Sequence, residues 1–371
     1  MEYVATCLFG LERLVGEEID ALGYKRTSTL DGRVIFEGDE SAAARFNIFS
    51  RYAERLYLRL GEFHASSFAE LFDGTKALPW EDYIGKLDAF PVKGHSIKSA
   101  LTSIPDCQSI VKKAIVNRLG EKYGIKWFDE SAQKYQVEFF ILKDEASLMI
   151  DLSGVPLHKR GYRPESNAAP IRETLAAALV SLARPREDVL FWDPMCGSGT
   201  IPIEAAMIMT KTAPGSNRSF VCEKYPQFAK KLFYDARNEA RDTRVKSDFE
   251  AYASDIDSAC VALTADNVRR AGMEDNIKVF HRDALKIETG GRRGTVVCNP
   301  PYGERLSDRE ECERLYRAMG RHFATLDSWQ IYIICSNENF ERLYGRRADK
   351  VRVLYNGMIK CNYYQFFKNK K

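Results

Sequence analysis

Residues 193–200 read Asp193-Pro194-Met195-Cys196-Gly197-Ser198-Gly199-Thr200, and this stretch decides the fold of the second half of the chain. The apolar run Val189–Trp192 precedes it and is expected to be a buried strand, while Ile201–Met209 has the composition of a helix. Glycines between a strand and a helix allow a tight turn and let backbone N–H groups approach a ligand closely. The stretch therefore predicts a ligand-binding loop at the end of a strand.

Three kinds of cofactor use such a loop, and the residues within it favour one of them. A dinucleotide site needs a glycine three positions after Gly199, where this chain has Pro202, and a phosphate-binding P-loop needs a lysine where this chain has Thr200. The remaining pattern, Asp-Pro-x-x-Gly-Ser-Gly-Thr, resembles motif I of the class I methyltransferases. Their cofactor, S-adenosylmethionine, has no pyrophosphate and carries a positive sulfonium and a positive ammonium group, so a carboxylate suits it.

The resemblance to motif I implies a role for most residues of the loop. The glycine backbone abuts the methionine part of the cofactor, and Asp193 faces its ammonium group. The expected cofactor-binding residues of this loop are Asp193, Pro194, Cys196, Gly197, Ser198, Gly199 and Thr200.

The strand expected at Phe249–Ala253 ends in a second acidic motif that suits the ribose and adenine of the same cofactor. Asp255 can accept a bidentate hydrogen bond from ribose hydroxyls, and Ile256 can pack on the adenine face. Asp257 is a candidate helix N-cap, and the alternative is that both acids are caps. Asp193 and Asp255 are about sixty residues apart, well beyond the roughly twenty of a dinucleotide fold, which predicts an insertion around Pro214–Asp248.

A third acidic position follows the strand expected at Ile277–Phe280. Asp283 is placed to accept the adenine amino group, with Ala284 beside it. The alternative is that Asp283 is simply a loop acid.

The tetrapeptide Asn299-Pro300-Pro301-Tyr302 follows the strand Thr295–Cys298 and carries the predicted chemistry. An exocyclic amine on an aromatic base is a poor nucleophile because its lone pair is delocalised into the ring. The Asn299 side-chain oxygen and the Pro300 carbonyl can accept its two hydrogens and aim the lone pair at the methyl group, while two prolines stiffen the loop. Tyr302 offers a ring on which a flipped base can stack.

These four residues resemble motif IV of the amino-group methyltransferases. The resemblance implies methylation of an sp² amino nitrogen without naming the substrate. Adenine-N6 DNA enzymes, guanine-N2 RNA enzymes and glutamine-amide protein enzymes all share the motif.

The alternation of strand and helix patterns in the second half predicts an α/β domain with a mostly parallel sheet. Short apolar runs alternate with helical patterns, as expected of strands buried on both faces. The runs are Val189–Trp192, Phe249–Ala253, Ile277–Phe280, Thr295–Cys298 and Ile331–Cys335. Asn356-Gly357 then separates two further strands as a hairpin signal, so a seven-stranded, Rossmann-like sheet closed by an antiparallel hairpin is expected.

The first half predicts two smaller α+β units. Strands are expected at Val4–Leu8, Arg33–Phe36, Arg55–Leu60, Tyr135–Leu142 and Ser147–Leu152, with helices at Leu11–Leu22, Ala42–Tyr52 and Cys107–Tyr123. Gly161–Pro170, which contains two prolines, is the expected linker to the second half.

A basic junction lies just before this linker. Tyr162 is flanked by Lys159, Arg160 and Arg163, a composition that suits phosphate and base contacts, although a solvated loop is the alternative. The run 150–163 resembles the end of a THUMP domain, an RNA-binding module, as found in the bacterial family of 23S rRNA guanine-N2 methyltransferases. Further resemblance lies at 167–173, 193–206, 213–220, 254–257 and 299–304.

The family resemblance implies a domain order and a reaction. We expect a ferredoxin-like segment at 1–62, a THUMP domain at 63–160 and a methyltransferase domain at 161–371. The implied reaction is methylation of a guanine N2 in RNA, with 23S rRNA as the expected substrate. The alternatives are an adenine-N6 DNA methyltransferase, a tRNA guanine-N2 methyltransferase and a non-catalytic RNA-binding assembly factor.

Composition restricts the other function classes. Hydrophobic residues make up 45% and charged residues 29% of the 371 residues, as in a globular protein, and the net charge of +3 gives no overall nucleic-acid signal. We expect no membrane span and no signal peptide, and the nine cysteines, without a Cys-x-x-Cys pair, predict neither disulfides nor a metal site. A cytoplasmic location is expected.

Overall fold

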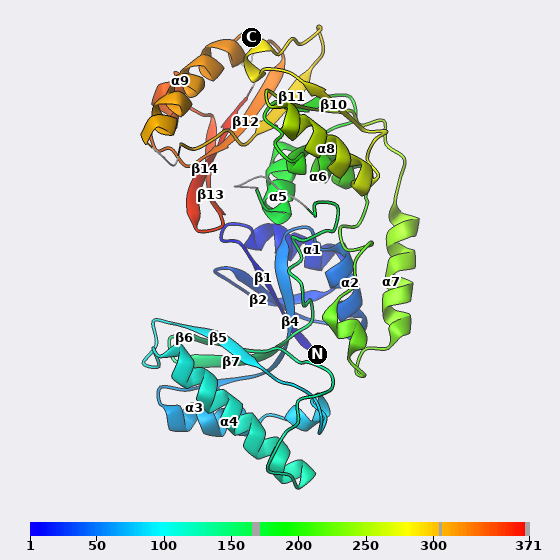
Figure 1. The fold of residues 1–371 in the computed structure, drawn as a ribbon, viewed down its shortest axis with the longest axis vertical. Coiled ribbons are helices and arrows are strands. Elements are labelled where there is room, and N and C mark those ends of the chain that lie inside the picture. The colour runs from blue at the N-terminus through cyan, green and yellow to red at the C-terminus, as the bar shows by residue number, and fades with distance from the viewer. Residues whose placement is uncertain (165–170, 304–305, 368–371) are drawn as a thin grey trace.

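The computed structural model describes residues 1–164, 171–303 and 306–367. Residues 165–170 of the predicted linker and Glu304 of the family resemblance lie outside the described residues. Figure 1 shows an elongated molecule, with the C-terminal sheet at one end, the N-terminal segment in the middle and helices α3 and α4 at the other end.

One continuous seven-stranded sheet runs through both predicted N-terminal units, in the order β2-β3-β1-β4-β7-β6-β5. Its strands are β1 (Glu2–Cys7), β2 (Lys25–Leu30), β3 (Arg33–Glu37), β4 (Ala53–His64), β5 (Val92–Ile97), β6 (Val137–Leu142) and β7 (Glu145–Asp151). The long strand β4 pairs with β1 on one side and with β7 on the other. The predicted boundary between residues 62 and 63 therefore falls inside a strand that both units share.

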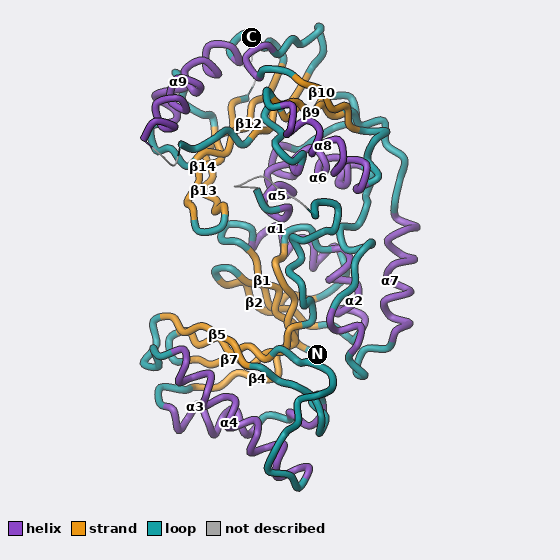
Figure 2. Tube along the Cα trace, in the orientation of Figure 1, coloured by secondary structure: helices purple, strands orange, loops and turns teal. Residues whose placement is uncertain are grey.

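Four helices cover this first sheet, two on each half (Figures 1 and 2). They are α1 (Glu12–Ala21), α2 (Ser41–Phe49), α3 (Phe68–Ala77) and α4 (Ile104–Tyr123). The sequence patterns predicted α1, α2 and α4 but not β2, α3 or β5. Strand β2 has the sequence Lys-Arg-Thr-Ser-Thr-Leu and buries none of these residues, so it has no apolar alternation to detect.

The second sheet has the predicted architecture, with strand order β10-β9-β8-β11-β12-β14-β13. Its strands are β8 (Leu190–Asp193), β9 (Ala251–Asp255), β10 (Ile277–His281), β11 (Gly294–Cys298), β12 (Trp329–Cys335), β13 (Lys350–Asn356) and β14 (Ile359–Phe366). The first five pair in parallel, whereas β14 runs antiparallel to both β12 and β13. The expected parallel sheet with a closing hairpin is confirmed.

Helices and apolar clusters lie on both faces of this second sheet. The helices on these faces are α5 (Glu173–Ala183), α6 (Thr200–Met209), α8 (Ser258–Ala271), α9 (Leu306–Phe323) and α10 (Phe340–Tyr344), whereas α7 (Lys230–Thr243) lies away from the sheet. Phe191 belongs to the cluster with α5 and α6, and its neighbour Trp192 belongs to the cluster with α9 and α10. Successive residues of a strand point to opposite faces, which explains why β8 is apolar throughout.

The predicted insertion wraps back along the N-terminal half. Its helix α7 lies beside α2, and the side chains of Arg45 and Glu239 form an ion pair between the two helices at 2.6 Å. Before α7, the ring of Tyr225 stacks on Tyr135 with centroids 4.2 Å apart. The insertion therefore packs the two halves of the molecule against each other.

Candidate active site

A cavity of ≈ 850 Å³ lies at the carboxyl ends of the parallel strands, where open α/β sheets bind ligands. Residues from all the predicted catalytic-domain motifs line it. They are Asp193, Pro194, Cys196, Gly197, Ser198, Thr200, Asp255, Ile256, Asp283, Ala284, Asn299, Pro300, Pro301 and Tyr302. Segments more than a hundred residues apart in the sequence thus line a single cavity.

Helix α8 holds the glycine loop in place from behind. The Thr264 hydroxyl donates to the Gly197 carbonyl at 2.9 Å, and the Asn267 amide donates to the Ser198 carbonyl at 2.8 Å. Gly199 does not line the cavity, because it faces α8. Its φ is +78°, and a Cβ there would lie 2.7 Å from Thr264 Cγ2. Glycine is thus required at this position by both backbone conformation and space.

Asp193 is a buried carboxyl group at the cavity wall, with 1% of its surface exposed. Its Oδ1 accepts the Met195 backbone N–H at 3.2 Å. Burial raises the pKa of Asp193 well above its ordinary value, and the nearby Asp255 carboxylate acts in the same direction. A buried acid of this kind is stabilised in its charged form by a cation, which suits the ammonium group expected there.

Asp255 ties the second acidic motif to the glycine loop. Its Oδ2 accepts the Gly197 N–H at 2.9 Å, and its Oδ1 accepts the Asp257 N–H at 3.0 Å. Asp257 in turn accepts the Ala259 N–H at 2.9 Å, which confirms its prediction as the N-cap of α8. Ile256 is 67% exposed and lies on the cavity, as a residue that packs on a ligand ring would.

Asp283 combines both interpretations that the sequence left open. One carboxylate oxygen accepts the Leu285 N–H at 2.9 Å and caps the short helix Ala284–Lys286. The residue also lines the cavity, so its other oxygen remains suitable for the adenine contact, which stays a prediction.

The tetrapeptide loop is held by two tyrosine hydroxyl groups. The Tyr302 hydroxyl donates to Asn299 Oδ1 at 2.6 Å, and the Tyr316 hydroxyl of α9 donates to the Pro301 carbonyl at 2.6 Å. Burial raises the pKa of Tyr302 well above its ordinary value, so this hydroxyl stays protonated and acts as a donor. The Asn299 oxygen predicted to accept a substrate amine therefore has an internal partner in this structure.

Several cavity residues were not predicted from the sequence. Helix α9 contributes Asp308, Glu311, Cys312 and Leu315, and the closing hairpin contributes Asn356 and Ile359. The Asn-Gly signal predicted the hairpin itself. Nothing in the local sequence indicated that the hairpin and α9 reach the cavity, because that depends on how the sheet closes.

The cavity suits S-adenosylmethionine by the chemistry of its groups. Carboxyl groups of Asp193, Asp255 and Asp283 surround a space whose expected occupant carries two positive charges. Gly197 lies on the cavity wall, and the close packing of Gly199 on Thr264 holds this turn beside it. The residues present therefore fit this cofactor.

The structure corrects the prediction that the basic junction contacts RNA through Arg160, Tyr162 and Arg163. These side chains are buried, with 4%, 5% and 7% of their surface exposed. Arg160 pairs with Glu204 of α6 at 3.5 Å and donates to the carbonyls of Leu157 and Arg51. Of the four predicted RNA contacts, only Lys159 is exposed.

The other two junction residues are engaged in the same buried network. The Tyr162 hydroxyl donates to Glu204 Oε1 at 3.0 Å, and Arg163 pairs with Glu173 of α5 at 2.9 Å. Arg163 also donates to the Thr200 hydroxyl at 2.8 Å. Buried acids on two helices draw these basic side chains inward, so they support the glycine loop from behind and do not meet a phosphate.

Comparison with known protein families agrees with this site. Residues 160–365 match the RMKL-like methyltransferase domain, residues 2–57 match the RlmL ferredoxin-like domain and residues 65–151 match the THUMP domain. The chain belongs to the RMKL-like methyltransferase family. The predicted ferredoxin-like, THUMP and methyltransferase composition is confirmed, and S-adenosylmethionine is the cofactor of this family member.

Two relatives of this RMKL-like methyltransferase differ in length. The Bacillus subtilis protein YpsC, named as a candidate RNA methyltransferase, is 45% identical over 98% of this chain and 95% of its own length. The ribosomal RNA large subunit methyltransferase K/L of Aliivibrio salmonicida is 35% identical over 97% of this chain and 52% of its own length. The chain thus spans about half the length of this K/L relative.

Two solved structures share the whole fold of this family member. A methyltransferase named SMU.472, solved in complex with S-adenosylhomocysteine, has a TM-score of 0.91 and 40% identity, covering 100% of this chain and 98% of its own. A Listeria monocytogenes protein, described as a predicted N6-adenine-specific DNA methylase, has a TM-score of 0.91 and 46% identity, covering 99% of this chain and 96% of its own.

No helix among the described ranges combines the length and the apolar composition needed to cross a bilayer.

Proposed function

We propose that this methyltransferase transfers a methyl group to the exocyclic N2 amino group of a guanine in RNA, with 23S rRNA as the substrate. The observation that carries the amino-group part is that Asn299 and Tyr302 line the same cavity as Asp193 and Gly197. The THUMP match supports RNA, and the names of the K/L relatives support rRNA. The assignment of guanine as the methylated base rests on the family resemblance.

The residues of the chain position the nucleophile. Asn299 Oδ1 and the Pro300 carbonyl accept the two hydrogens of the amine, which directs its lone pair into the cavity. Bound S-adenosylmethionine supplies an electrophilic methyl group on a sulfonium. Since Tyr302 now donates to Asn299 Oδ1, the incoming amine replaces this hydroxyl, and the released ring becomes available for stacking on the base. Catalysis then depends mainly on positioning.

The second candidate function is methylation of adenine N6 in DNA. The description of the Listeria monocytogenes relative favours it, and the tetrapeptide serves both chemistries. The THUMP domain is the feature that argues for RNA. A tRNA guanine is the next substrate to consider, and a non-catalytic assembly role is disfavoured because Asp193, Asp255 and Asn299 all lie together at the cavity.

Nucleoside mass spectrometry of a deletion strain tests the substrate. We expect N2-methylguanosine to disappear from one position of 23S rRNA and to return when the wild-type gene is restored. Loss of the modified guanosine from tRNA, or loss of N6-methyladenine from DNA, would replace the proposal with the corresponding alternative.

The variant Asn299→Ala tests the assigned chemistry in the same strain and in vitro. We expect kcat to fall by about 10²–10³-fold, while the Kd for S-adenosylmethionine stays within a few-fold, because Asn299 acts on the amine. Asn339→Ala, which changes an exposed asparagine outside the cavity, is the matched control. Full activity of Asn299→Ala would refute the role of this side chain.

A further inference from the structure

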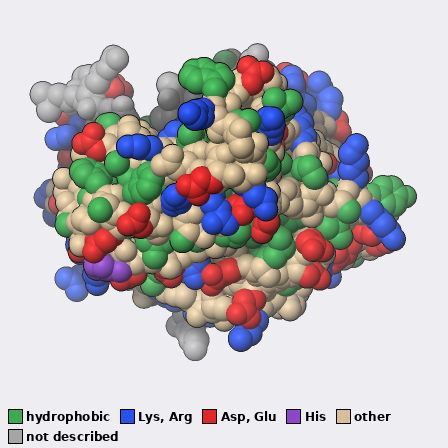
Figure 3. Space-filling model, turned by 90° about the horizontal axis from the view of Figure 1, so that it is seen from below, with side chains coloured by type: hydrophobic (Ala, Val, Ile, Leu, Met, Phe, Trp, Pro, Cys, Tyr) green, Lys and Arg blue, Asp and Glu red, His purple; other side chains and the backbone are tan. Residues whose placement is uncertain are grey.

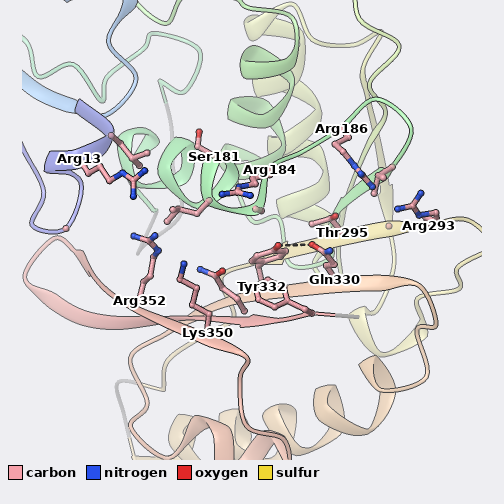
Figure 4. A pocket seen from close by; sticks show the side chains of 18 of the residues that line it. Arg13, Ser181, Arg184, Arg186, Arg293, Thr295, Gln330, Tyr332, Lys350 and Arg352 are labelled. Carbon is pink, nitrogen blue, oxygen red and sulfur yellow. Dashed lines mark hydrogen bonds between the residues drawn. The ribbon is translucent and has the colours of Figure 1, made fainter. Parts of the chain in front are cut away.

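A second pocket of ≈ 650 Å³ lies at the opposite edge of the same sheet, where the parallel strands begin (Figure 4). The starts of β11 and β12, the end of β14 and the start of β13 form its floor, and α1 and the end of α5 close it. Strand β11 separates it from the cofactor cavity by its full length, roughly 15 Å at about 3.3 Å per residue. The pocket is therefore distinct from the methyl-transfer site.

Positively charged residues dominate the lining of this second pocket, which we call the basic pocket. Its lining contains six basic residues and one acid, Glu17, and the basic residues are Arg13, Arg184, Arg186, Arg293, Lys350 and Arg352. By contrast, Figure 3 shows acidic and basic side chains interspersed across the end of the molecule that α3 and α4 form. Charge of one sign around a cavity raises the local concentration of ligands of the opposite sign.

Internal acids neutralise only part of this charge. Arg13 pairs with Glu17 at 2.7 Å, while Arg186 and Arg293 share Asp188 at 3.6 and 3.7 Å. Within the described residues, Arg184, Lys350 and Arg352 have no carboxylate within ion-pairing distance. Three cations that lie on two different elements thus share one pocket without a counter-charge.

The uncompensated side chains are directed into the pocket. Figure 4 shows Arg352 and Lys350 rising from β13 toward Arg13 and the end of α5. Arg352 Nε is shielded from solvent and has no hydrogen-bond partner among the described atoms. Arg184 is the C-cap of α5 and has a φ of +52°, the left-handed conformation in which many helices end.

The helix dipole does not account for this arrangement. A cation at the C-terminal end of α5 is favourable, and this explains Arg184 on its own. Lys350 and Arg352 of β13 add two further positive charges, which exceed the roughly half negative charge of a helix C-terminus. Guanidinium groups that converge with neutral donors such as Thr295 and Gln330 match the several acceptor oxygens of a phosphate.

We propose that the basic pocket binds phosphate groups, and that the RNA substrate supplies them from its backbone at a point remote from the methylated base. The inference that RNA is the source rests on the proposed function. A contact of this kind fixes the register of the strand without reading its sequence, while the cavity at the other edge of the sheet acts on the base.

The triple variant Arg184→Gln, Lys350→Gln, Arg352→Gln tests the proposal in the full chain. The probes are 23S rRNA from the deletion strain and inorganic tripolyphosphate, each titrated at several salt concentrations. We expect the slope of log K for rRNA against log salt to fall by about 2, since each single-strand phosphate contact contributes about 0.7, and the affinity to drop about tenfold or more. Tripolyphosphate binding should be lost, with an unchanged Kd for S-adenosylmethionine.

The control variant Lys230→Gln, Lys231→Gln, Arg241→Gln removes the same charge from the outer helix α7 and should leave both slopes unchanged.

If the triple variant fails to fold, Lys350→Glu alone, an exposed position, should reduce the rRNA slope by about 1 or more. Unchanged binding of both probes overturns the pocket. Loss of tripolyphosphate binding with an unchanged rRNA slope overturns RNA as the source. If the triple variant loses rRNA binding but the wild-type enzyme methylates no rRNA, the pocket is retained and the proposed function is refuted.

Discussion

At the scale of single residues, the polar groups of the site hold the loop and face the ligand at the same time. Asp255 uses both carboxylate oxygens for backbone N–H groups, yet each oxygen has a second lone pair for a ribose hydroxyl. Asp283 caps a short helix with one oxygen. Asp193 has a single backbone donor, which leaves it the acid most in need of a cationic partner.

The raised pKa of Asp193 makes cofactor affinity depend on pH. Burial disfavours the charged form of this carboxyl group in the free protein, and a bound ammonium favours that form, so cofactor binding lowers the pKa and favours release of a proton. The Kd for S-adenosylmethionine is therefore expected to fall as the pH rises through the range in which this carboxyl group loses its proton in the free protein. Isothermal titration in buffers of different ionisation enthalpy measures both the Kd and the released proton.

The variant Asp193→Asn serves as the control for this pH dependence. It keeps the shape of the side chain and the acceptor for the Met195 N–H but cannot ionise. We expect weak binding that no longer varies with pH. A wild-type pH slope in this variant would assign the titration to another group.

Tyr302 is expected to contribute through its ring and not through its hydroxyl. Tyr302→Phe removes the donor that now occupies Asn299 Oδ1 and keeps the ring, so kcat/KM should stay within a few-fold or rise. Tyr302→Ala should lower kcat/KM by about 10–100-fold, because stacking on a base contributes about 1–3 kcal/mol. Single-turnover methylation of unmodified rRNA measures both variants, and equal losses in the two would refute the stacking role.

At the scale of elements, α8 is the brace of the cofactor loop. Its N-cap follows the acidic motif directly, so one short segment places Asp255 and begins the helix whose next turns carry Thr264 and Asn267. The loop itself has two glycines with positive φ, at +54° and +78°. Side chains of α8 donate hydrogen bonds to the loop carbonyls of Gly197 and Ser198.

Asn267→Ala is expected to loosen this loop. The side chain is buried, and its loss leaves the Ser198 carbonyl without that donor, which should cost about 1–3 kcal/mol in the free energy of unfolding. Cofactor affinity should also fall, because the loop forms part of the cavity. Urea denaturation and cofactor titration measure the two effects. Asp266→Ala, an exposed neighbour on the same helix, should change stability by no more than about 0.5 kcal/mol.

At the scale of the whole molecule, a buried charge network joins the N-terminal half to the methyltransferase domain. Arg160 donates to the Ser50 and Arg51 carbonyls on one side and pairs with Glu204 on the other. Burial raises the pKa of Glu204, and the Arg160 guanidinium opposes that rise. The network, together with α7, fixes how the two halves meet and hence how the basic pocket closes.

Arg163→Met is expected to lower the stability of the protein without a specific effect on its affinity for RNA. It leaves Glu173 buried and unpaired, a change that costs about 3–5 kcal/mol, and thermal unfolding should show it as a large drop in Tm. Lys159→Met, an exposed neighbour, should leave Tm almost unchanged and weaken RNA binding if its predicted contact exists. A stable Arg163→Met variant with weakened RNA affinity would restore the original interpretation of the junction.

Local signals were sufficient for most of the fold and for the cofactor motifs. The glycine loop, the tetrapeptide and the Asn-Gly hairpin each depend on backbone chemistry within a few residues, so their structures follow from the sequence alone. The buried strands of the second sheet were visible because both of their faces are apolar. The edge strands β2 and β5 were missed, since polar residues in short strands carry no periodic signal.

The sequence by itself determined which residues meet at the candidate site, because they follow the ends of strands that a parallel sheet must bring to one edge. Only the tertiary structure decided the direction of the basic side chains. Arg160 and Arg163 turn inward because Glu204 and Glu173 lie buried on helices that meet them in the fold. Arg13, Arg184 and Arg352 converge on one pocket because folding brings α1, the end of α5 and β13 together, and charges from such distant segments become neighbours only in the tertiary structure.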